Sequence, residues 1–393
     1  MITGIKYISL LGAIGQFTAA KRYMLGLSNC GIPLTWTPLM WHASPASALR
    51  PYEGTTAGDP DLDRFCNRSI DYDTVIVHTP PALFPYWAER EAGRQIVGYV
   101  VWETDRLPRH WPGLLSCLKR ILVPSRWTRD VCKAAGVTPP ISVVPHICDG
   151  RLGDHPSPEG PYTFYTIETW SARKAVDSTI RCYVHTFTGD DSTVLVAKTG
   201  AQAYRQLLPP RLAPLRRAYG SVRAFLGLPV WMSFQKAPAA RVNASLRRVA
   251  NPPPVRLITS ELDEDGIRDL HRNGDCYLSL THAEAWGLGA FDAAAAGKPV
   301  IMTRFGGQLD FLPSDLAYLV NYRLVSARDD LDPQNFTADQ RWAEADLAHA
   351  SKLMRYVFEH RDEARAKGER LGRYVRETFS EARVIAEMMD AID

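Results

Sequence analysis

Two carboxylates, Glu284 and Asp292, are separated by seven residues within the segment CYLSLTHAEAWGLGAFDAAAAGKPVIMTRFGGQLDFL (276–312). The segment begins as a buried strand, continues through a glycine-containing turn, and enters the Ala-rich run 290–296, which favours a helix. A strand, a glycine turn and a helix bring free backbone N–H groups and the positive helix end to one point, which suits a diphosphate. Carboxylates also accept hydrogen bonds from sugar hydroxyls. We therefore predict that Glu284 and Asp292 bind one ligand around a phosphate site.

An alternative explanation of this segment is an ordinary strand–helix–strand unit in which the glycines only turn corners. In that interpretation Gly297 ends the helix, residues 298–299 turn the chain, and residues 306–307 form a close-approach loop after the next strand. The segment alone leaves both interpretations open.

The elements that would position these residues alternate between short apolar runs and helix-like stretches, as parallel strands joined by crossover helices do. In the first half we expect strands at 6–11, 74–78, 95–102, 120–123 and 141–144, with helices at 17–29 and 126–135. In the second half we expect strands at 162–167, 193–198, 255–259, 276–279 and 299–303, with helices between them. The region 343–392 has a helical pattern with an interruption near 378–379.

The chain of 393 residues is too long for one ordinary hydrophobic core but suits two α/β domains of fewer than about 200 residues each. Residues 151–161 are rich in Gly, Pro and Asp and lack apolar periodicity, so we interpret them as a linker. They would separate an N-terminal Rossmann-like domain, 1–150, from a C-terminal one, 162–379. We expect the last helix, 380–393, to return to the N-terminal domain.

With 46% hydrophobic and 23% charged residues, and no apolar run long enough to span a membrane, the composition predicts a soluble globular protein. The apolar stretch 7–15 is better explained as a first strand than as a signal peptide, so we expect a cytoplasmic protein. The seven cysteines are scattered without CxxC spacing, and His146 and His282 lack ligand spacing with any carboxylate or cysteine. We therefore expect no metal site and no cofactor.

Positive charge is concentrated in the stretch 198–256. Between Asp191 and Glu261 there is no acidic residue, whereas eleven cations occur there, nine of them arginines. This stretch is either a solvated face or a surface for an anionic acceptor or an acidic membrane, since arginine binds phosphate and carboxylate groups bidentately. No recognised nucleic-acid motif accompanies it, so we expect no nucleic acid as a partner.

The segment 276–312 resembles the retaining GT-B glycosyltransferases of family 4, whose hallmark is Glu-x7-Glu in a segment like EGFGLPxxEAxAxGxPVI. Glu284 matches the first acid, and Asp292 matches the second as a shorter carboxylate. The stretches VPSRWTRDVCKAAGVTPPISVVPHICD (123–149) and WSARKAVD (170–177) are similar to other elements of the family. The resemblance covers most of the chain from 95 to 312.

This resemblance implies a GT-B fold, in which two Rossmann-like domains face each other across a cleft. It also implies that Glu284 contacts the transferred sugar and that Asp292 binds the ribose. The residues Gly287, Leu288 and Gly289 would hold phosphate and sugar through their backbones.

The same resemblance implies a cation pair for the leaving group. Lys174, assisted by Arg173, would neutralise the diphosphate, because a leaving nucleoside diphosphate gains negative charge in the transition state. Many family members carry an arginine where this chain has Glu168, and Arg173 or Lys198 would then supply the missing charge.

Four residues of the N-terminal half are expected to face the cleft. Gly12 and Gly15 resemble the family's glycine loop, which approaches the donor phosphate and the acceptor, although a tight βα turn explains them equally well. His78 and Glu103 follow expected strands at the carboxyl ends, where doubly wound sheets place ligands. Glu103 would either orient or partly deprotonate the acceptor hydroxyl, or it would only fix its own loop. His78 has either a catalytic or a structural role.

Together these residues predict a hexosyltransferase. It would move a hexose from a nucleoside-diphosphate sugar to a hydroxyl of a glycan, glycolipid or other acceptor, with retention of anomeric configuration and without a metal. Because of the basic stretch 198–256, we also expect an anionic or lipid-linked acceptor and contact with the inner face of the membrane. The alternatives are a nucleotide-sugar epimerase on the same fold and a non-catalytic nucleotide-sugar or glycan-binding protein, which Asp292 and Glu168 motivate.

Overall fold

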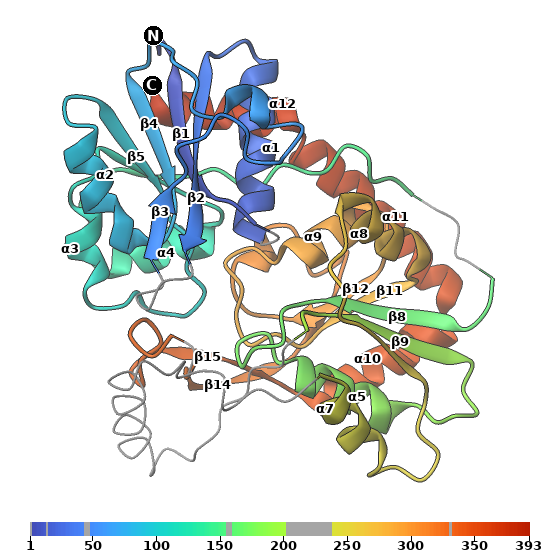
Figure 1. The fold of residues 1–393 in the computed structure, drawn as a ribbon. Helices are drawn as coiled ribbons and strands as arrows, with labels where there is room; N and C mark the ends of the chain where they lie inside the picture. Colours follow the sequence, from blue (N-terminus) through green and yellow to red (C-terminus); the bar gives the residue numbers. More distant parts are fainter. Residues whose placement is uncertain (1, 13–14, 43–47, 155–158, 202–237, 330–331) are drawn as a thin grey trace.

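The computed structural model describes residues 2–12, 15–42, 48–154, 159–201, 238–329 and 332–393. The chain forms two α/β domains, each built around a predominantly parallel sheet (Figure 1). The N-terminal domain lies at the top of the figure and the C-terminal domain below it. The prediction of two Rossmann-like α/β domains is confirmed.

The N-terminal domain contains a seven-stranded sheet in the order β3-β2-β1-β4-β5-β6-β7. Its strands are β1 (Ile5–Leu10), β2 (Leu34–His42), β3 (Ala48–Pro51), β4 (Thr74–His78), β5 (Gln95–Tyr99), β6 (Arg120–Val123) and β7 (Ile141–Val143). Its helices are α1 (Gly15–Asn29), α2 (Phe84–Arg90), α3 (Trp111–Leu115) and α4 (Arg126–Ala134). Every strand pair is parallel except β2 with β3. The loops that follow β1, β4 and β5 therefore share one edge of the sheet.

The C-terminal domain contains a six-stranded, fully parallel sheet in the order β10-β9-β8-β11-β12-β13. Its strands are β8 (Tyr162–Ile167), β9 (Thr193–Lys198), β10 (Val255–Ile258), β11 (Cys276–Ser279), β12 (Val300–Thr303) and β13 (Tyr318–Val320). Its helices include α5 (Val176–Thr186), α7 (Pro238–Leu246), α8 (Glu264–Asn273) and α9 (Leu288–Ala295). The central strands β11 and β12 are buried throughout, as expected of a sheet covered on both faces.

Three helices end the chain: α10 (Leu347–Glu359), α11 (Arg361–Thr378) and α12 (Glu381–Ile392). Helix α12 packs on α1 of the N-terminal domain, where Asn29 donates a 2.8 Å hydrogen bond to Glu381. The two chain termini therefore lie in the same domain (Figure 1). Among the helices that the structure describes, none is both long and apolar enough to cross a membrane.

An antiparallel hairpin of β14 (Tyr322–Ser326) and β15 (Arg341–Ala345) extends from the C-terminal domain toward the N-terminal one. The backbone of Arg341 exchanges hydrogen bonds with Asp105 of the N-terminal domain. Phe336 stacks on Trp102 with ring centroids 5.1 Å apart. The hairpin region thus forms a second connection between the domains, besides α12.

The structure contains every expected strand and differs from the sequence prediction at five others. Strand β2 was missed because Pro38 interrupts its pattern, since proline lacks the N–H that a ladder needs. Strands β3 and β13 are very short, and the paired strands β14 and β15 have no apolar run. The expected helical start at 343 is wrong, because β15 occupies 341–345 and Asp346 caps the helix that follows.

Gly368 in α11 packs against the end of α9, where a methyl group would lie 2.5 Å from the Gly297 carbonyl oxygen and 2.6 Å from the Pro299 nitrogen. We predict that Gly368→Ala lowers the free energy of unfolding by about 1–3 kcal/mol, because these backbone atoms cannot move aside. Urea denaturation measures the change. Gly113 in α3 has open space around it, so the control Gly113→Ala should be neutral or stabilising by up to about 1 kcal/mol. Equal effects of the two substitutions would contradict the close packing.

Candidate active site

Glu284 lies in the loop between β11 and α9, and only 6% of its side chain is exposed. Its Oε1 accepts a 2.7 Å hydrogen bond from Lys174 Nζ and a 3.0 Å bond from the Thr281 hydroxyl. Its Oε2 lies 3.4 Å from a guanidinium nitrogen of Arg173. Lys174 and Arg173 belong to the turn between β8 and α5. The neighbouring strands β8 and β11 thus bring the expected acid and both expected cations together.

Glu168, directly after β8, supplies a second carboxylate to Lys174. Its Oε2 lies 2.9 Å from Lys174 Nζ, and its Oε1 accepts a 3.0 Å hydrogen bond from the Ser279 hydroxyl. The side chain is 5% exposed. The sequence prediction treated Glu168 only as a place where an arginine is usual. An acidic residue directly after a buried strand, at the ligand-binding edge of a parallel sheet, is the signal that could have identified it.

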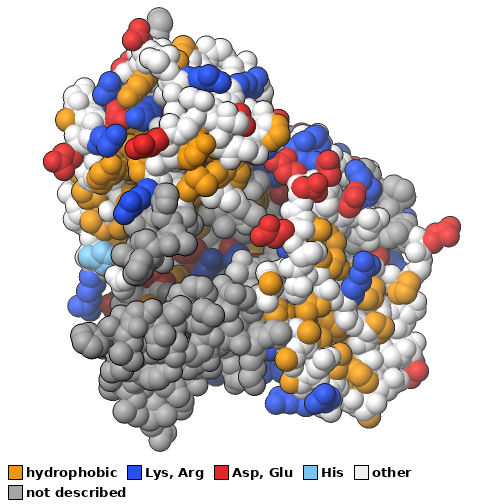
Figure 2. Space-filling view, viewed as in Figure 1, with side chains coloured by type: hydrophobic (Ala, Val, Ile, Leu, Met, Phe, Trp, Pro, Cys, Tyr) orange, Lys and Arg blue, Asp and Glu red, His pale blue; other side chains and the backbone are white. Residues whose placement is uncertain are grey.

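Glu103 reaches this group from the N-terminal domain. Its Oε1 lies 3.3 Å from a guanidinium nitrogen of Arg173, so an ion pair joins the two domains beside Glu284. Figure 2 shows the molecule hollowed between the domains, with charged side chains of both signs visible inside.

Burial raises the pKa of all three carboxyl groups, and the neighbouring charges decide the final direction. For Glu284, the cations Lys174 and Arg173 outweigh burial, so its pKa lies below the ordinary range and it is an anion at neutral pH. For Glu168, burial and the charge of Glu284 outweigh Lys174, and its pKa is raised. For Glu103, burial and Glu284 outweigh Arg173, and its pKa is also raised.

The glycine turn before α9 lies next to the start of α1. Gly287 has a positive φ of 90°, which favours glycine, and it precedes the first residue of α9. A methyl group at Gly289 would lie 3.0 Å from the Ile167 carbonyl oxygen. A methyl group at Gly15 would lie 3.9 Å from a Leu288 side-chain carbon. The glycine turns of the two domains therefore face each other, and Leu288 lies between them.

Asp292, on α9, is bound by Arg22 of α1. The two guanidinium nitrogens lie 2.9 Å from the two carboxylate oxygens, a bidentate arrangement. The Asp292 and Arg22 side chains are 8% and 15% exposed. Sequence reasoning missed Arg22. Its signal is a charged residue in a helix between buried neighbours such as Ala20 and Tyr23.

Three other expected site residues do not join the Glu284 group. His78 is buried, and its Nδ1 shares a 2.9 Å hydrogen bond with the Tyr7 hydroxyl. Burial lowers the pKa of His78 to about 3. Lys198 donates a 3.0 Å hydrogen bond to the Thr199 carbonyl. Gly12 has a φ of 144° and open space where a side chain would be.

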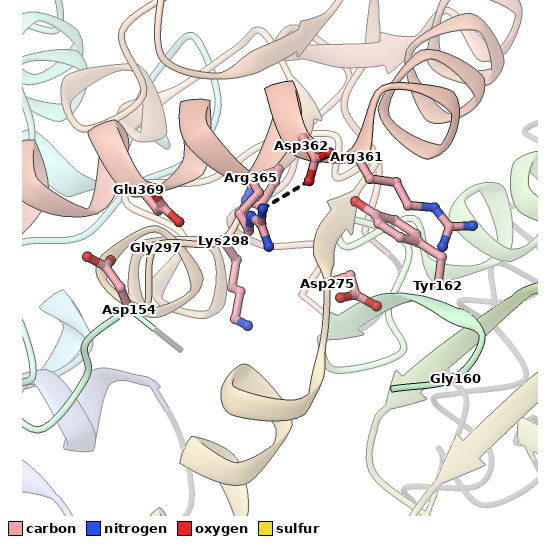
Figure 3. Close-up of a pocket in the computed structure, with 11 residues that line it drawn as sticks. Asp154, Gly160, Tyr162, Asp275, Gly297, Lys298, Arg361, Asp362, Arg365 and Glu369 are labelled. Atoms are coloured by element: carbon pink, nitrogen blue, oxygen red, sulfur yellow. Dashed lines mark hydrogen bonds and ion pairs between the residues drawn. The ribbon is translucent and has the colours of Figure 1, made fainter. Parts of the chain in front are cut away.

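A cavity of about 160 Å³ lies at the opposite edge of the C-terminal sheet (Figure 3). It is lined by the starts of β8 and β11, by the end of α9, and by the first turns of α11. Its charges are of both signs, including Lys298, Arg365, Asp275 and Glu369. Because Glu284 follows the carboxyl end of β11, this cavity is separate from the Glu284 group.

Two further expectations concern metals and the basic stretch. Among the residues that the structure describes, no group of three or more His, Cys, Asp or Glu side chains is placed to hold a metal ion. Within the basic stretch, residues 202–237 lie outside the described ranges. Arg241, which is described, pairs with Asp177.

No protein-family model and no curated protein matches the sequence, but solved structures match it along nearly its whole length. HepE of Anabaena, in complex with UDP and glucose, has 10% sequence identity and a TM-score of 0.63, with 98% of each chain covered. Sucrose-phosphate synthase from Thermosynechococcus elongatus has 12% identity and a TM-score of 0.64, with 98% of each chain covered. A glycosyltransferase from Rickettsia africae has 11% identity and a TM-score of 0.60, over 99% of this chain and 98% of that one.

This chain has the GT-B fold. The implied fold is therefore confirmed. At such low identity the likeness establishes the fold, while membership of family 4 stays a prediction.

The Arg22–Asp292 pair should contribute strongly to stability, because removal of either partner takes away the closest opposite charge of a largely buried group. We predict that Arg22→Ala lowers the free energy of unfolding by about 3–5 kcal/mol, whereas the double variant Arg22→Ala, Asp292→Ala loses less than the sum of the single losses. Denaturant titration of the four proteins measures the coupling. The pair Arg365–Asp362 is largely exposed, and Arg365→Ala should cost less than about 1 kcal/mol. Additive losses at Arg22 and Asp292 would contradict the coupling.

Proposed function

We propose that this protein is a glycosyltransferase. It moves a hexose from a nucleoside-diphosphate sugar to a hydroxyl of a glycan, glycolipid or other acceptor, with retention of anomeric configuration and without a metal. The observation that carries this proposal is the group formed by Glu284, Lys174 and Arg173 beside the start of α9, with Glu103 opposite. The GT-B fold supports it, because the structural neighbour HepE is in complex with UDP and glucose.

The diphosphate of the donor is proposed to bind between the start of α9 and Lys174. The first intrahelical hydrogen bond of α9 runs from Phe291 to Gly287, so the N–H groups of residues 288–290 are available at the positive helix end. An ammonium group has three N–H donors, and Lys174 uses two of them on Glu284 and Glu168. The third can serve a phosphate oxygen and stabilise the charge of the leaving group.

The carboxylates are proposed to bind the sugar parts of the donor. Glu284 is held in place by Lys174 and Thr281 and accepts a hydrogen bond from a hydroxyl of the transferred hexose. A carboxylate has about four lone-pair sites, so Asp292 can accept from the ribose while Arg22 occupies two of them. Arg22 would then orient Asp292 toward the nucleotide.

The acceptor is proposed to enter from the side of Glu103. Its raised pKa makes this carboxylate a better proton acceptor than an ordinary glutamate, and it would orient or partly deprotonate the acceptor hydroxyl. His78 is proposed to support this side of the cleft through the Tyr7 contact. The basic stretch 198–256 leads us to propose a cytoplasmic enzyme whose acceptor is anionic or lies at the inner face of the membrane.

Glu284→Gln tests the proposal most simply, because the amide keeps the shape of the side chain but loses its charge. We predict that transfer falls by at least about a hundredfold, the scale expected when one electrostatic contact to the transition state is lost. The thermal unfolding temperature should change little. The control is Glu344→Gln, at an ion pair with Arg323 on the exposed hairpin, which should transfer normally. Normal turnover by Glu284→Gln would refute the assignment.

The donor is identified by thermal shift with the glucose conjugates of UDP, GDP, ADP and dTDP. A ligand present at 100 times its dissociation constant stabilises the native state by about 2.7 kcal/mol. Transfer in the presence of EDTA would support the metal-independent mechanism. Binding without transfer or hydrolysis across a broad acceptor panel would instead favour a binding protein. That candidate is supported by the ion pairs that Arg173 and Lys174 form with carboxylates, since these pairs already use part of the positive charge. Appearance of an isomerised sugar would favour an epimerase.

A further inference from the structure

Three buried carboxylates share two cations at the proposed donor site. Lys174 lies between Glu284 and Glu168, at 2.7 and 2.9 Å, and Arg173 lies between Glu284 and Glu103, at 3.4 and 3.3 Å. When all five groups are ionised, three negative charges face two positive ones. The three carboxylate side chains are 5–17% exposed, so water screens this excess only weakly.

A nucleotide sugar makes the imbalance larger, because its diphosphate brings two more negative charges to the same cations. Buried charges without partners are unstable, and a group in such a position changes its protonation state instead. Protonation of one carboxylate is the simplest way to reduce the excess negative charge. The three carboxylates differ in how readily they can take up this proton.

The contacts of the three carboxylates differ. Glu284 has two cations and the Thr281 hydroxyl, and its pKa is already lowered. Glu103 keeps its contact with Arg173 if Lys174 turns to the diphosphate. Among the described residues, the only cation in contact with Glu168 is Lys174. Its other contacts are hydroxyl groups of β11, such as Ser279 at 3.0 Å. Glu168 therefore loses the most when the positive charge of Lys174 is shared with a phosphate.

We propose that Glu168 takes up one proton when the nucleotide sugar binds, so that occupation of the donor site is coupled to pH. This inference rests on the proposed donor site. The neutral carboxyl group removes one of the excess negative charges, so that Lys174 compensates only Glu284 and the diphosphate. Glu168 is then a positioning residue, which acts through Lys174 and gives the site a pH dependence that an arginine at this place could not give.

The surroundings of Glu168 are consistent with a proton at this position. The titratable and charged groups that face it are Lys174, Arg173, Glu284 and Tyr277. On the side of β9, its contact is a 3.0 Å backbone hydrogen bond to the Lys198 carbonyl, which carries no charge. Burial and Glu284 already raise the pKa of Glu168 in the absence of donor, and removal of Lys174 would raise it further.

The sign of the pH dependence follows from this linkage. Below the pKa of Glu168 in the free protein, both states are protonated and affinity does not depend on pH. Between the pKa values of the free and bound states, donor affinity falls by about tenfold for each pH unit, because one proton must be taken up. Above the pKa of the bound state the affinity is again constant, at its lowest value.

Calorimetric titration of the full chain with UDP-glucose measures the proton directly. The diphosphate of UDP-glucose has no proton to exchange from about pH 6 to 8, so any uptake belongs to the protein. Titrations in Hepes and in Tris, whose ionisation enthalpies differ, give the number of protons taken up. We expect close to one in the wild-type protein, none in Glu168→Gln, and an affinity for Glu168→Gln at about pH 8 that exceeds the wild-type affinity by at least about tenfold.

Glu103→Gln is the matched control, because it removes another carboxylate with a raised pKa from the same cation pair. It should retain the uptake of one proton. Glu168→Met repeats the test with an uncharged side chain of similar length if the amide disturbs the fold.

Binding of UDP-glucose without proton uptake, or uptake that is lost in Glu103→Gln and kept in Glu168→Gln, would overturn the inference. Failure of all four nucleotide sugars to bind would overturn the donor site itself.

Discussion

The ammonium group of Lys174 contacts Glu284 and Glu168 at the same time, and both carboxylates are almost fully withdrawn from water. Each charge can stay buried only because the others are near, since a buried ion without a partner is strongly destabilising. The arrangement requires that β8 and β11 be neighbours, because Glu168 ends one strand and Glu284 follows the other. The parallel order of the C-terminal sheet is thus the condition for the whole site.

The two domains are joined through the same region. Arg173 pairs with Glu103, and Asp292 pairs with Arg22, so each of these contacts joins a residue near the proposed donor site to the N-terminal domain. Helix α12, which packs on α1, holds the domains together from the other end of the chain. Residues of the proposed donor site therefore also make contacts between the domains.

The sequence predicted the strands that carry the site because they are buried, apolar and flanked by glycine or polar turns. It also predicted the meeting of Glu284 with Lys174, because a family resemblance marks both positions. It could not predict the contacts between the domains. Arg22 and Glu103 are 270 and 70 residues away from their partners, Asp292 and Arg173, and no periodicity connects them. Pairings of this kind follow from how the domains dock, which depends on many side chains together.

At Asp292 and Glu168 the structure shows ion-pair partners that the sequence did not predict. Asp292 was expected to bind the ribose, and the structure adds a bidentate arginine from the N-terminal domain to the same carboxylate. Glu168 was noted only because the family usually has an arginine at this position, yet its carboxylate forms an ion pair with Lys174. In both cases the residue type was visible in the sequence, but its partner was not.

A crystal structure of the protein with a bound nucleotide sugar tests the central claim most directly. We expect an oxygen of the diphosphate to lie about 2.7–3.2 Å from Lys174 Nζ, beside the N–H groups at the start of α9. A nucleotide sugar bound elsewhere, for example in the cavity lined by Lys298 and Arg365, with Lys174 still engaged only by Glu284 and Glu168, would contradict it.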